Sequence, residues 1–291
     1  MAALTGQSVA LIGLGLMGRP MAKNLLAAGA DLVVANRSPG PVQELVALGA
    51  RAADDFADAA SGADIIILML ADTPVVEAVT MAMEPGLRSG QLVIDMGTTA
   101  VMATRRLADH VALKGVAWLD APVSGGQIGA VEGTMTIMAG GEQRDFDRAG
   151  PVLDVLGSRR TLVGPVGCGQ VAKAANQVIV GLTIGAVSEA LALAAHAGAD
   201  PAKVREALAG GFAASRILDV HGQRMIEGAF APGGKATTQR KDMDQALDLA
   251  EAVGLHLPAT QMSRDLYDRL IAAGFGGLDH SALFKVIDEG L

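Results

Sequence analysis

A glycine-rich turn between a strand and a helix is the feature that most constrains this sequence. The apolar run Val9–Ile12 leads into Gly-Leu-Gly-Leu-Met-Gly at 13–18, and an amphipathic segment follows. In this order, Gly13 permits the tight turn, Gly15 lets backbone amides approach a pyrophosphate, and Gly18 lets helix and strand pack closely. The glycine spacing alone is a weak signal, but with a strand before it and a helix after it the turn becomes a candidate dinucleotide site. The candidate cofactor residues here are Gly13, Leu14, Gly15, Leu16, Met17 and Gly18.

Short apolar runs alternate with Ala-rich helical segments over the first 164 residues. This alternation predicts a mostly parallel sheet covered by helices, a doubly wound α/β domain of Rossmann type. Several runs, such as Ile65–Leu70, are apolar without alternation, as expected of strands buried on both faces. The expected strands are Val9–Ile12, Leu32–Ala35, Ile65–Leu70, Leu92–Met96, Ala117–Leu119, Thr134–Met138 and Thr161–Val163.

Strand signals are absent from the C-terminal part. The segment from Gln170 to about Ala197 has no proline and carries small and aliphatic residues all round, so we expect one long buried helix that joins the two halves. The rest shows helical periods broken by glycine and proline, with a loop expected over 230–239. We therefore predict an α/β domain, which carries the candidate dinucleotide site, at 1–164 and an all-helical domain at 165–291.

Charge and composition limit the partners and the compartment. A net charge of −8 argues against nucleic acid as a partner, because phosphate binding needs clustered Lys and Arg. The single cysteine, Cys168, cannot form an internal disulfide, and no signal peptide is evident, so a cytoplasmic location is expected. The most apolar stretch, Val178–Val187, is followed by Ser188 and is too short to cross a bilayer, so no membrane partner is expected. The high apolar content, 51%, predicts a homodimer or homotetramer that covers part of the surface.

The end of the second expected strand bears on the choice of cofactor. An NAD site places Asp or Glu there to bind the ribose hydroxyls, whereas this chain has Asn36-Arg37-Ser38. The Arg37 guanidinium can pair with a 2′-phosphate, and Asn36 and Ser38 can donate neutral hydrogen bonds to it. The pattern favours NADP(H) over NAD. The alternative is that Arg37 is only a solvated charge after a strand.

Two glycine-rich segments carry the candidate chemistry. Ser124-Gly125-Gly126 offers flexible amides and a hydroxyl, which suit a carboxylate, although it could also be a simple turn. Further on, glycines open the long helix and place Lys173 and Asn176 three apart, so that both side chains share one helix face. Taken alone, a helical lysine is usually a solvated surface charge.

Together these segments resemble the β-hydroxyacid dehydrogenase family, which is related to 3-hydroxyisobutyrate dehydrogenase. Four blocks carry the resemblance in the family's order and cover nearly the whole chain: Gly13–Leu26, Asp120–Gly141, Gly164–Asn176 and Lys241–Asp242. The resemblance implies a Rossmann-type NADP-binding domain at 1–164, a long interdomain helix, and an all-helical C-terminal domain at 165–291 that serves substrate binding and oligomer formation.

Matched position by position, the resemblance implies a role for each candidate residue. The catalytic lysine falls on Lys173 and the substrate-positioning asparagine on Asn176. The substrate-carboxylate loop falls on Ser124, Gly125 and Gly126, with Thr98 as a further substrate and cofactor contact. The implied cofactor contacts outside the glycine-rich turn are Asn36, Arg37, Ser38, Met69, Leu70, Thr98, Lys241 and Asp242. One departure is Gly234, which stands where close relatives have phenylalanine, so an aromatic wall near the cofactor is expected to be missing.

Within the family, segments such as Ala175–Val180 and Asp279–Leu283 are most similar to the tartronate semialdehyde reductases. The implied reaction is the NADPH-dependent reduction of 2-hydroxy-3-oxopropionate to glycerate. Lys173 would act as the general acid that protonates the carbonyl oxygen, and the same group would act as the base in reverse.

Alternative functions remain at this point. Another member reaction could apply: oxidation of 3-hydroxyisobutyrate, serine or threonine, or reduction of glyoxylate or succinic semialdehyde. Imine reductases share the architecture but generally lack the lysine, so Lys173 counts against them. A non-catalytic NADP-binding module is a further alternative. The five histidines show no metal-ligand spacing, so no metal is predicted and they are interpreted as structural or exposed.

Overall fold

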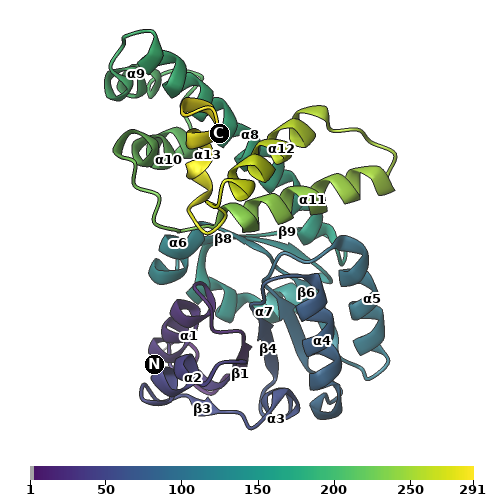
Figure 1. Cartoon of the computed structure of the whole chain (residues 1–291). Helices are drawn as coiled ribbons and strands as arrows, with labels where there is room; N and C mark the ends of the chain where they lie inside the picture. Colours follow the sequence, from purple (N-terminus) through teal and green to yellow (C-terminus); the bar gives the residue numbers. More distant parts are fainter. Residues whose placement is uncertain (1–2) are drawn as a thin grey trace. The chain divides into compact units, whose positions relative to one another are not determined.

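The computed structural model describes residues 3–291, and the chain divides into two compact units. The first ends at Lys173 and the second runs from Ala174 to Leu291. The boundary lies inside one continuous helix, α8 (Cys168–His196), which matches the long helix expected from the sequence (Figure 1).

The first unit is built on a sheet whose parallel part has the strand order β3-β2-β1-β4-β5-β6. Beyond β6, strand β8 pairs antiparallel with β6 and β7 and parallel with β9. The mostly parallel sheet predicted from the sequence is therefore confirmed. The strands are β1 (Ser8–Ile12), β2 (Asp31–Ala35), β3 (Arg51–Ala52), β4 (Ile65–Leu68), β5 (Leu92–Asp95), β6 (Ala117–Asp120), β7 (Val123–Ser124), β8 (Met135–Gly140) and β9 (Gly157–Gly164).

Two of these strands, β3 and β7, were not expected, because each spans only two residues and carries no periodic signal. Strand β9 also begins earlier than the expected run at Thr161. Its pairing with β8 extends it across Arg159 and Arg160, which hydropathy alone does not assign to a strand.

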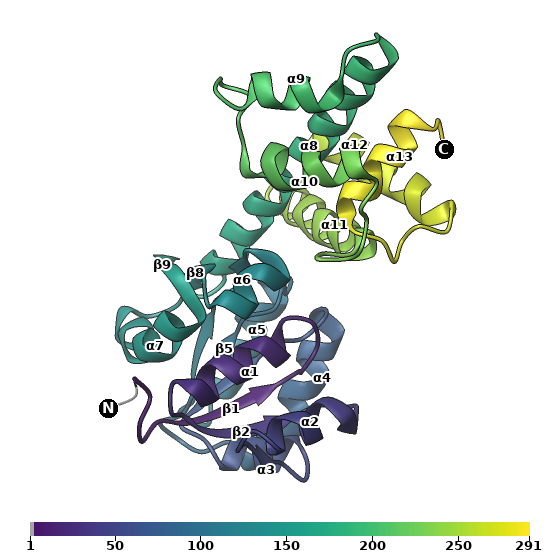
Figure 2. The ribbon, with the colours of Figure 1, turned by 90° about the vertical axis from the view of Figure 1, so that its left-hand side faces the viewer.

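Side chains of the central strand β1 alternate between two apolar cores, one on each face of the sheet. Val9 and Leu11 belong to the core that includes residues of α1 and α7, whereas Ala10 and Ile12 belong to the core that includes residues of α3, α4 and α5. Helices thus cover both faces, as a doubly wound fold requires (Figure 1, Figure 2). The helices of this unit are α1 (Gly18–Ala27), α2 (Pro39–Val46), α3 (Phe56–Ser61), α4 (Thr73–Met83), η1 (Glu84–Gly86), α5 (Val101–Ala112), α6 (Gly126–Glu132) and α7 (Gln143–Leu156).

The second unit is helical throughout its named elements, as predicted. After α8 it contains α9 (Pro201–Leu208), α10 (Arg216–Glu227), α11 (Ala236–Ala252), α12 (Pro258–Ala272), η2 (His280–Ala282) and α13 (Leu283–Asp288). The loop expected over 230–239 is wrong at its end, because α11 already begins at Ala236. The amides of Ala236 and Thr237 donate to the carbonyls of Leu278 and Gly276, so long-range contacts fix this helix start.

Helix α8 is long and apolar enough to cross a membrane, judged by length and composition alone. Its apolar window is longer than the ten residues noted in the sequence, because small and aliphatic residues continue past Ser188. However, 44% of that window is buried inside the structure. Ile184, Val187 and Leu191 belong to the core of the second unit together with residues of α10, α11 and α12. These contacts make α8 a core helix.

Candidate active site

Each glycine of the turn after β1 meets a different steric demand. A Cβ at Gly13 would lie 2.3 Å from the carbonyl oxygen of Met69, and one at Gly18 would lie 1.9 Å from the carbonyl oxygen of Gly13. Gly13 also has φ +102, which favours glycine. A Cβ at Gly15, by contrast, would meet nothing within 4 Å. Packing therefore explains Gly13 and Gly18, while Gly15 borders open space, as the passage of a pyrophosphate requires. Leu14 is buried, Met17 is half-buried and Leu16 is exposed.

Of the residues after β2, Asn36 makes hydrogen bonds within the loop, whereas Arg37 is exposed to solvent. Asn36 accepts a hydrogen bond from the Leu14 amide at 3.0 Å and donates from Nδ2 to the Ser38 carbonyl at 3.0 Å. Both ends of the Asn36 amide therefore join the ends of β1 and β2, where the sequence suggested a donor to phosphate. Arg37 is exposed, and within residues 3–291 its side chain makes no hydrogen bond or ion pair. A charged side chain in this position can turn toward an incoming anion.

The ends of β4 and β5 lie beside the glycine-rich turn. Met69 donates its amide to Ile12, and its carbonyl is the atom that a Cβ at Gly13 would strike. Leu70, also half-buried, has a side-chain methyl within 2.9 Å of that same Cβ position. Thr98 follows the end of β5 by three residues and is half-buried. The carboxyl edge of the sheet thus brings together the cofactor residues predicted from β1, β2, β4 and β5.

A buried carboxylate holds the start of α8. Asp120 accepts hydrogen bonds from the amides of Gly167 at 2.7 Å and Gln170 at 2.9 Å, which lie at the first turn of the helix. Burial raises the pKa of Asp120 from its ordinary value, and the backbone hydrogen bonds oppose this rise. A Cβ at Gly169 would lie 2.5 Å from the Met138 carbonyl oxygen, so glycine is required where the helix passes β8. This packing fixes the position of the next helical turn.

That next turn carries Lys173, a buried residue that is 8% exposed. Its Nζ donates to the carbonyl oxygen of Val123 at 2.8 Å, directly before Ser124. Gly125 and Gly126 follow with φ +130 and +58, which exposes the backbone as α6 begins. The predicted catalytic amine and the predicted carboxylate loop therefore lie next to each other.

Gln170 is a functional candidate that the sequence analysis missed. Its Nε2 donates to the Gly97 carbonyl at 3.0 Å and its Oε1 accepts from the Thr99 amide at 3.1 Å. Thr99 in turn donates to Asp95 at 2.6 Å and is buried, which leaves Thr98 as the more accessible hydroxyl. A polar residue in the first turn of an apolar helix was the available signal. Gln170 ties the loop that bears Thr98 to the helix that bears Lys173.

The second unit holds the other predicted site residues in a buried amide network. Asn176 donates from Nδ2 to Gln177 Oε1 at 2.7 Å, and Gln177 donates from Nε2 to Asp242 Oδ2 at 2.6 Å. Asp242 is 4% exposed, and its Oδ1 pairs with the ammonium of Lys241 at 3.0 Å. Gln239, buried nearby, accepts from Gln177 at 3.2 Å. Asp242 therefore orients both Lys241 and Gln177. Through Gln177 and Asp242, the network connects Asn176 to Lys241, the two residues to which the resemblance assigns substrate and cofactor contacts.

Comparison with known proteins gives the family. Residues 8–164 match the profile of the NAD-binding domain of 6-phosphogluconate dehydrogenase, and residues 167–287 match the NAD-binding profile of NADP-dependent 3-hydroxyisobutyrate dehydrogenase. The chain is 47% identical to 2-hydroxy-3-oxopropionate reductase of Escherichia coli over 281 residues, which cover 95% of this chain and 96% of that protein. The chain belongs to the β-hydroxyacid dehydrogenase family.

Other members of the family are also similar over their full length. The 3-hydroxyisobutyrate dehydrogenase of Pseudomonas aeruginosa is 35% identical, with 96% of this chain and 97% of the relative covered. A solved structure of the Mycobacterium tuberculosis 3-hydroxyisobutyrate dehydrogenase with L-serine superimposes with a TM-score of 0.89 at 29% identity, covering 97% of this chain and 99% of that one. This β-hydroxyacid dehydrogenase is therefore an oxidoreductase that acts on CH–OH groups with a nicotinamide cofactor.

The residues present fit that cofactor. Gly15 borders open space at the start of α1, where the amides of a helix N-terminus favour an anion. The first unit of the dehydrogenase carries residues 13–18, 36–38 and 69–70 at one edge of its sheet, along with Thr98. When the nicotinamide dinucleotide is bound, residues 13–18 and 36–38 would hold its pyrophosphate and adenosine half, and residues 69–70 and Thr98 would be further contacts.

Proposed function

We propose that this enzyme reduces a small semialdehyde that carries a carboxylate, with NADPH as the hydride donor. The best candidate substrate is 2-hydroxy-3-oxopropionate, which would be converted to glycerate. The relative that is 47% identical over nearly the whole chain is named for this substrate, which supports the choice. Relatives named for 3-hydroxyisobutyrate and L-serine are 35% and 34% identical.

The buried amine of Lys173 carries the chemical part of the proposal. When bound, NADPH supplies the hydride that reduces the carbonyl carbon. Negative charge then develops on the carbonyl oxygen, and an acid must stand within hydrogen-bond reach of it. Lys173 is held by the Val123 carbonyl beside Ser124, so a substrate carboxylate bound by the Ser124–Gly126 loop would bring its carbonyl group close to this acid. Lys173 would protonate the oxygen as the alcohol forms.

Asn176 and Lys241 are proposed to act by binding. Asn176 lies one helical turn after Lys173 on α8, and one hydrogen bond from its Nδ2 to Gln177 orients its amide, which would bind a substrate hydroxyl. Lys241, oriented by Asp242, would supply positive charge toward the cofactor or substrate.

Preference for NADPH is proposed from Arg37. Its exposed guanidinium follows β2, where an NAD-specific site would carry a carboxylate. It would pair with the 2′-phosphate, with Ser38 in support.

We further propose a cytoplasmic homodimer or homotetramer. The helical unit exposes large apolar side chains, among them Ile179 at 66% and Leu193 at 71%. An oligomer would cover such residues. Light scattering at micromolar concentration should give at least twice the monomer mass, and a clean monomer would contradict the proposal.

A substrate panel tests the proposed function directly. Initial rates should be measured for C3 and C4 semialdehydes, glyoxylate, 3-hydroxyisobutyrate, L-serine and L-threonine, each with the reduced or oxidised form of both nicotinamide cofactors. The highest kcat/KM is expected for 2-hydroxy-3-oxopropionate with NADPH. A higher kcat/KM for another panel member would make that compound the substrate in place of 2-hydroxy-3-oxopropionate. Tight NADPH binding without turnover of any compound would favour a non-catalytic NADP-binding module.

A further inference from the structure

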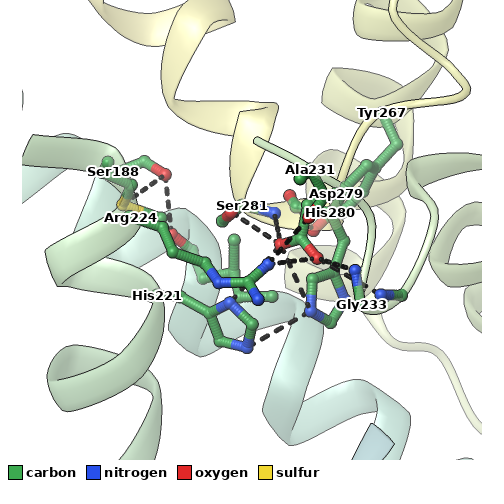
Figure 3. A network of polar contacts seen from close by, with 12 residues as sticks. Ser188, His221, Arg224, Ala231, Gly233, Tyr267, Asp279, His280 and Ser281 are labelled. Atoms are coloured by element: carbon green, nitrogen blue, oxygen red, sulfur yellow. Dashed lines mark hydrogen bonds and ion pairs between the residues drawn. The ribbon is translucent and has the colours of Figure 1, made fainter. Parts of the chain in front are cut away.

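Three segments of the helical unit meet at one buried carboxylate, Asp279 (Figure 3). Its Oδ2 accepts from Arg224 Nη1 at 2.8 Å and from the Gly233 amide at 2.9 Å, and its Oδ1 accepts from the Ser281 hydroxyl at 2.6 Å. Asp279 is fully buried, and it is held in place by its ion pair with the Arg224 guanidinium and by the hydrogen bonds from Gly233 and Ser281.

Two imidazoles converge beside this anion. His221 comes from α10 and His280 from the segment before α13, and their Nε2 atoms lie 3.3 Å apart with the rings nearly perpendicular, at 85°. The backbone of His280 is fixed, because its amide donates to the Gly234 carbonyl at 2.8 Å and its carbonyl accepts from the Tyr267 hydroxyl at 3.2 Å. His280 is thus held by contacts that do not depend on its ring.

The separation of the two nitrogens matches the requirement of a single metal ion. Zinc binds histidine nitrogen at about 2.0–2.1 Å in tetrahedral geometry, which places two ligand nitrogens roughly 3.3–3.4 Å apart. His221 Nε2 and His280 Nε2 meet this distance without any movement of the backbone.

The carboxylate stands where a metal-binding histidine has its supporting partner. Asp279 Oδ1 lies 3.5 Å from Nδ1 of His221, the nitrogen on the far side of the ring from the shared Nε2 position. A carboxylate at that nitrogen fixes the tautomer and orientation of a metal-bound imidazole. Arg224 pairs with the other carboxylate oxygen, Oδ2, at 2.8 Å, which leaves Oδ1 as the oxygen nearest His221 Nδ1.

Gly234 keeps one edge of this pair uncovered. A Cβ at this position would already lie 3.6 Å from Cε1 and 3.8 Å from Nε2 of His280, so a larger side chain would lie against the edge that binds a metal. The side chains of His221 and His280 are 16% and 15% exposed, which leaves a route for a small ion. The glycine that departs from the family's aromatic residue therefore opens the histidine pair.

We propose that His221 and His280 bind one late first-row transition-metal ion, such as Zn²⁺ or Ni²⁺, with Asp279 as the carboxylate that orients His221. Imidazole nitrogen suits these metals, and water would complete the coordination because the protein supplies two nitrogens. The ion would join α10 to the segment that leads into α13, and it would stabilise the helical unit. The proposal does not rest on the identity of the substrate.

The test uses the full-length enzyme without an affinity tag, treated with a chelator and then desalted. Calorimetric titration with ZnCl₂ and with NiCl₂ should show saturable binding of one ion per chain, and the ion should raise the Tm. His221→Asn and His280→Asn should each weaken binding by roughly 100-fold or more, since even loss of a supporting partner costs ~10–100-fold. His256→Asn, which removes an exposed histidine of the same unit, is the matched control and should bind like the parent.

Two further measurements keep the proposal testable if a histidine variant fails to fold. In the parent, Zn²⁺ should shift the ring resonances of two of the five histidines and leave the other three in place. Gly234→Phe should weaken binding at least ~10-fold by covering His280 while both ligands remain. Absence of saturable binding, a shift of all five histidines alike, or equal affinity in the folded His221 and His280 variants would overturn the site and leave a pair of imidazoles that share a proton.

Discussion

Replacing Gln177 by glutamate should make the stability of the helical unit depend on pH. In the parent, Gln177 is buried and its Nε2 donates to Asp242 at 2.6 Å and to Gln239 Oε1 at 3.2 Å. The substitution turns this donor into an acceptor of the same shape. An ionised carboxylate would face a second carboxylate in a buried setting, so the introduced group would keep its proton and donate it to Asp242.

The size of the effect follows from the pKa of the introduced carboxyl. Glutamate titrates near ~4.3 in an unfolded chain, and burial beside a like charge should raise the folded value by roughly 2–3 units. Because the folded value is the raised one, the stability is fully present below about pH 4.3 and is lost as the pH rises through the folded pKa. At ~1.4 kcal/mol per unit, the variant should lose about 3–4 kcal/mol of unfolding free energy relative to the parent across this window.

Urea unfolding at pH 5 and pH 8 should measure about 2–3 kcal/mol of this loss, because pH 5 already lies above the unfolded pKa of ~4.3. The single buried tyrosine, Tyr267, reports on the helical unit and the single tryptophan, Trp118, on the first unit. The matched control is Gln177→Leu, which removes the same donor without adding a titrating group and should lower stability equally at both pH values. The KM for the best substrate should also rise more at pH 8 than at pH 5 in the glutamate variant, because Gln177 holds Asn176. If the glutamate variant and the parent differ by the same amount at both pH values, the reasoning is refuted.

Three further predictions concern the first unit. Lys173→Met and Lys173→Arg should each lower kcat by ~10²–10⁴-fold, since neither side chain can exchange the proton at neutral pH. NADPH binding, followed by fluorescence, should stay unchanged in both variants. A kcat within a few-fold of the parent would exclude Lys173 as the general acid. Arg37→Ala should raise the KM for NADPH by roughly 10- to 150-fold and leave that for NADH alone, and an unchanged ratio of the two efficiencies would exclude Arg37 from the phosphate site. Gly15→Ala should keep the parent Tm but weaken NADPH binding at least ~10-fold. Gly18→Ala should lower the free energy of unfolding by about 1–3 kcal/mol, because its Cβ would clash with the Gly13 carbonyl oxygen. The reverse pattern would contradict the roles assigned to these glycines.

The sequence by itself determined the local architecture of this enzyme. The strand, turn and helix around Gly13–Gly18 could be predicted, because each depends on residues that are neighbours in the chain. The same holds for α8, whose length and apolar character are properties of one continuous segment. Lys173 and the Ser124–Gly126 loop became candidates through the family resemblance, since taken alone the lysine could be a solvated surface charge and the loop a simple turn.

Only the tertiary structure decided which side chains hold those groups in place. Asp120 binds the first turn of α8 from 47 and 50 residues away in the sequence, and Gln177 meets Asp242 across a separation of 65. His221 and His280, interpreted as structural or exposed because their spacing shows no metal-ligand pattern, come together across 59 residues. Such pairings depend on how elements far apart in the sequence pack together. They could not be predicted, because hydrophobic periodicity shows which face of a helix is buried but not which element covers that face.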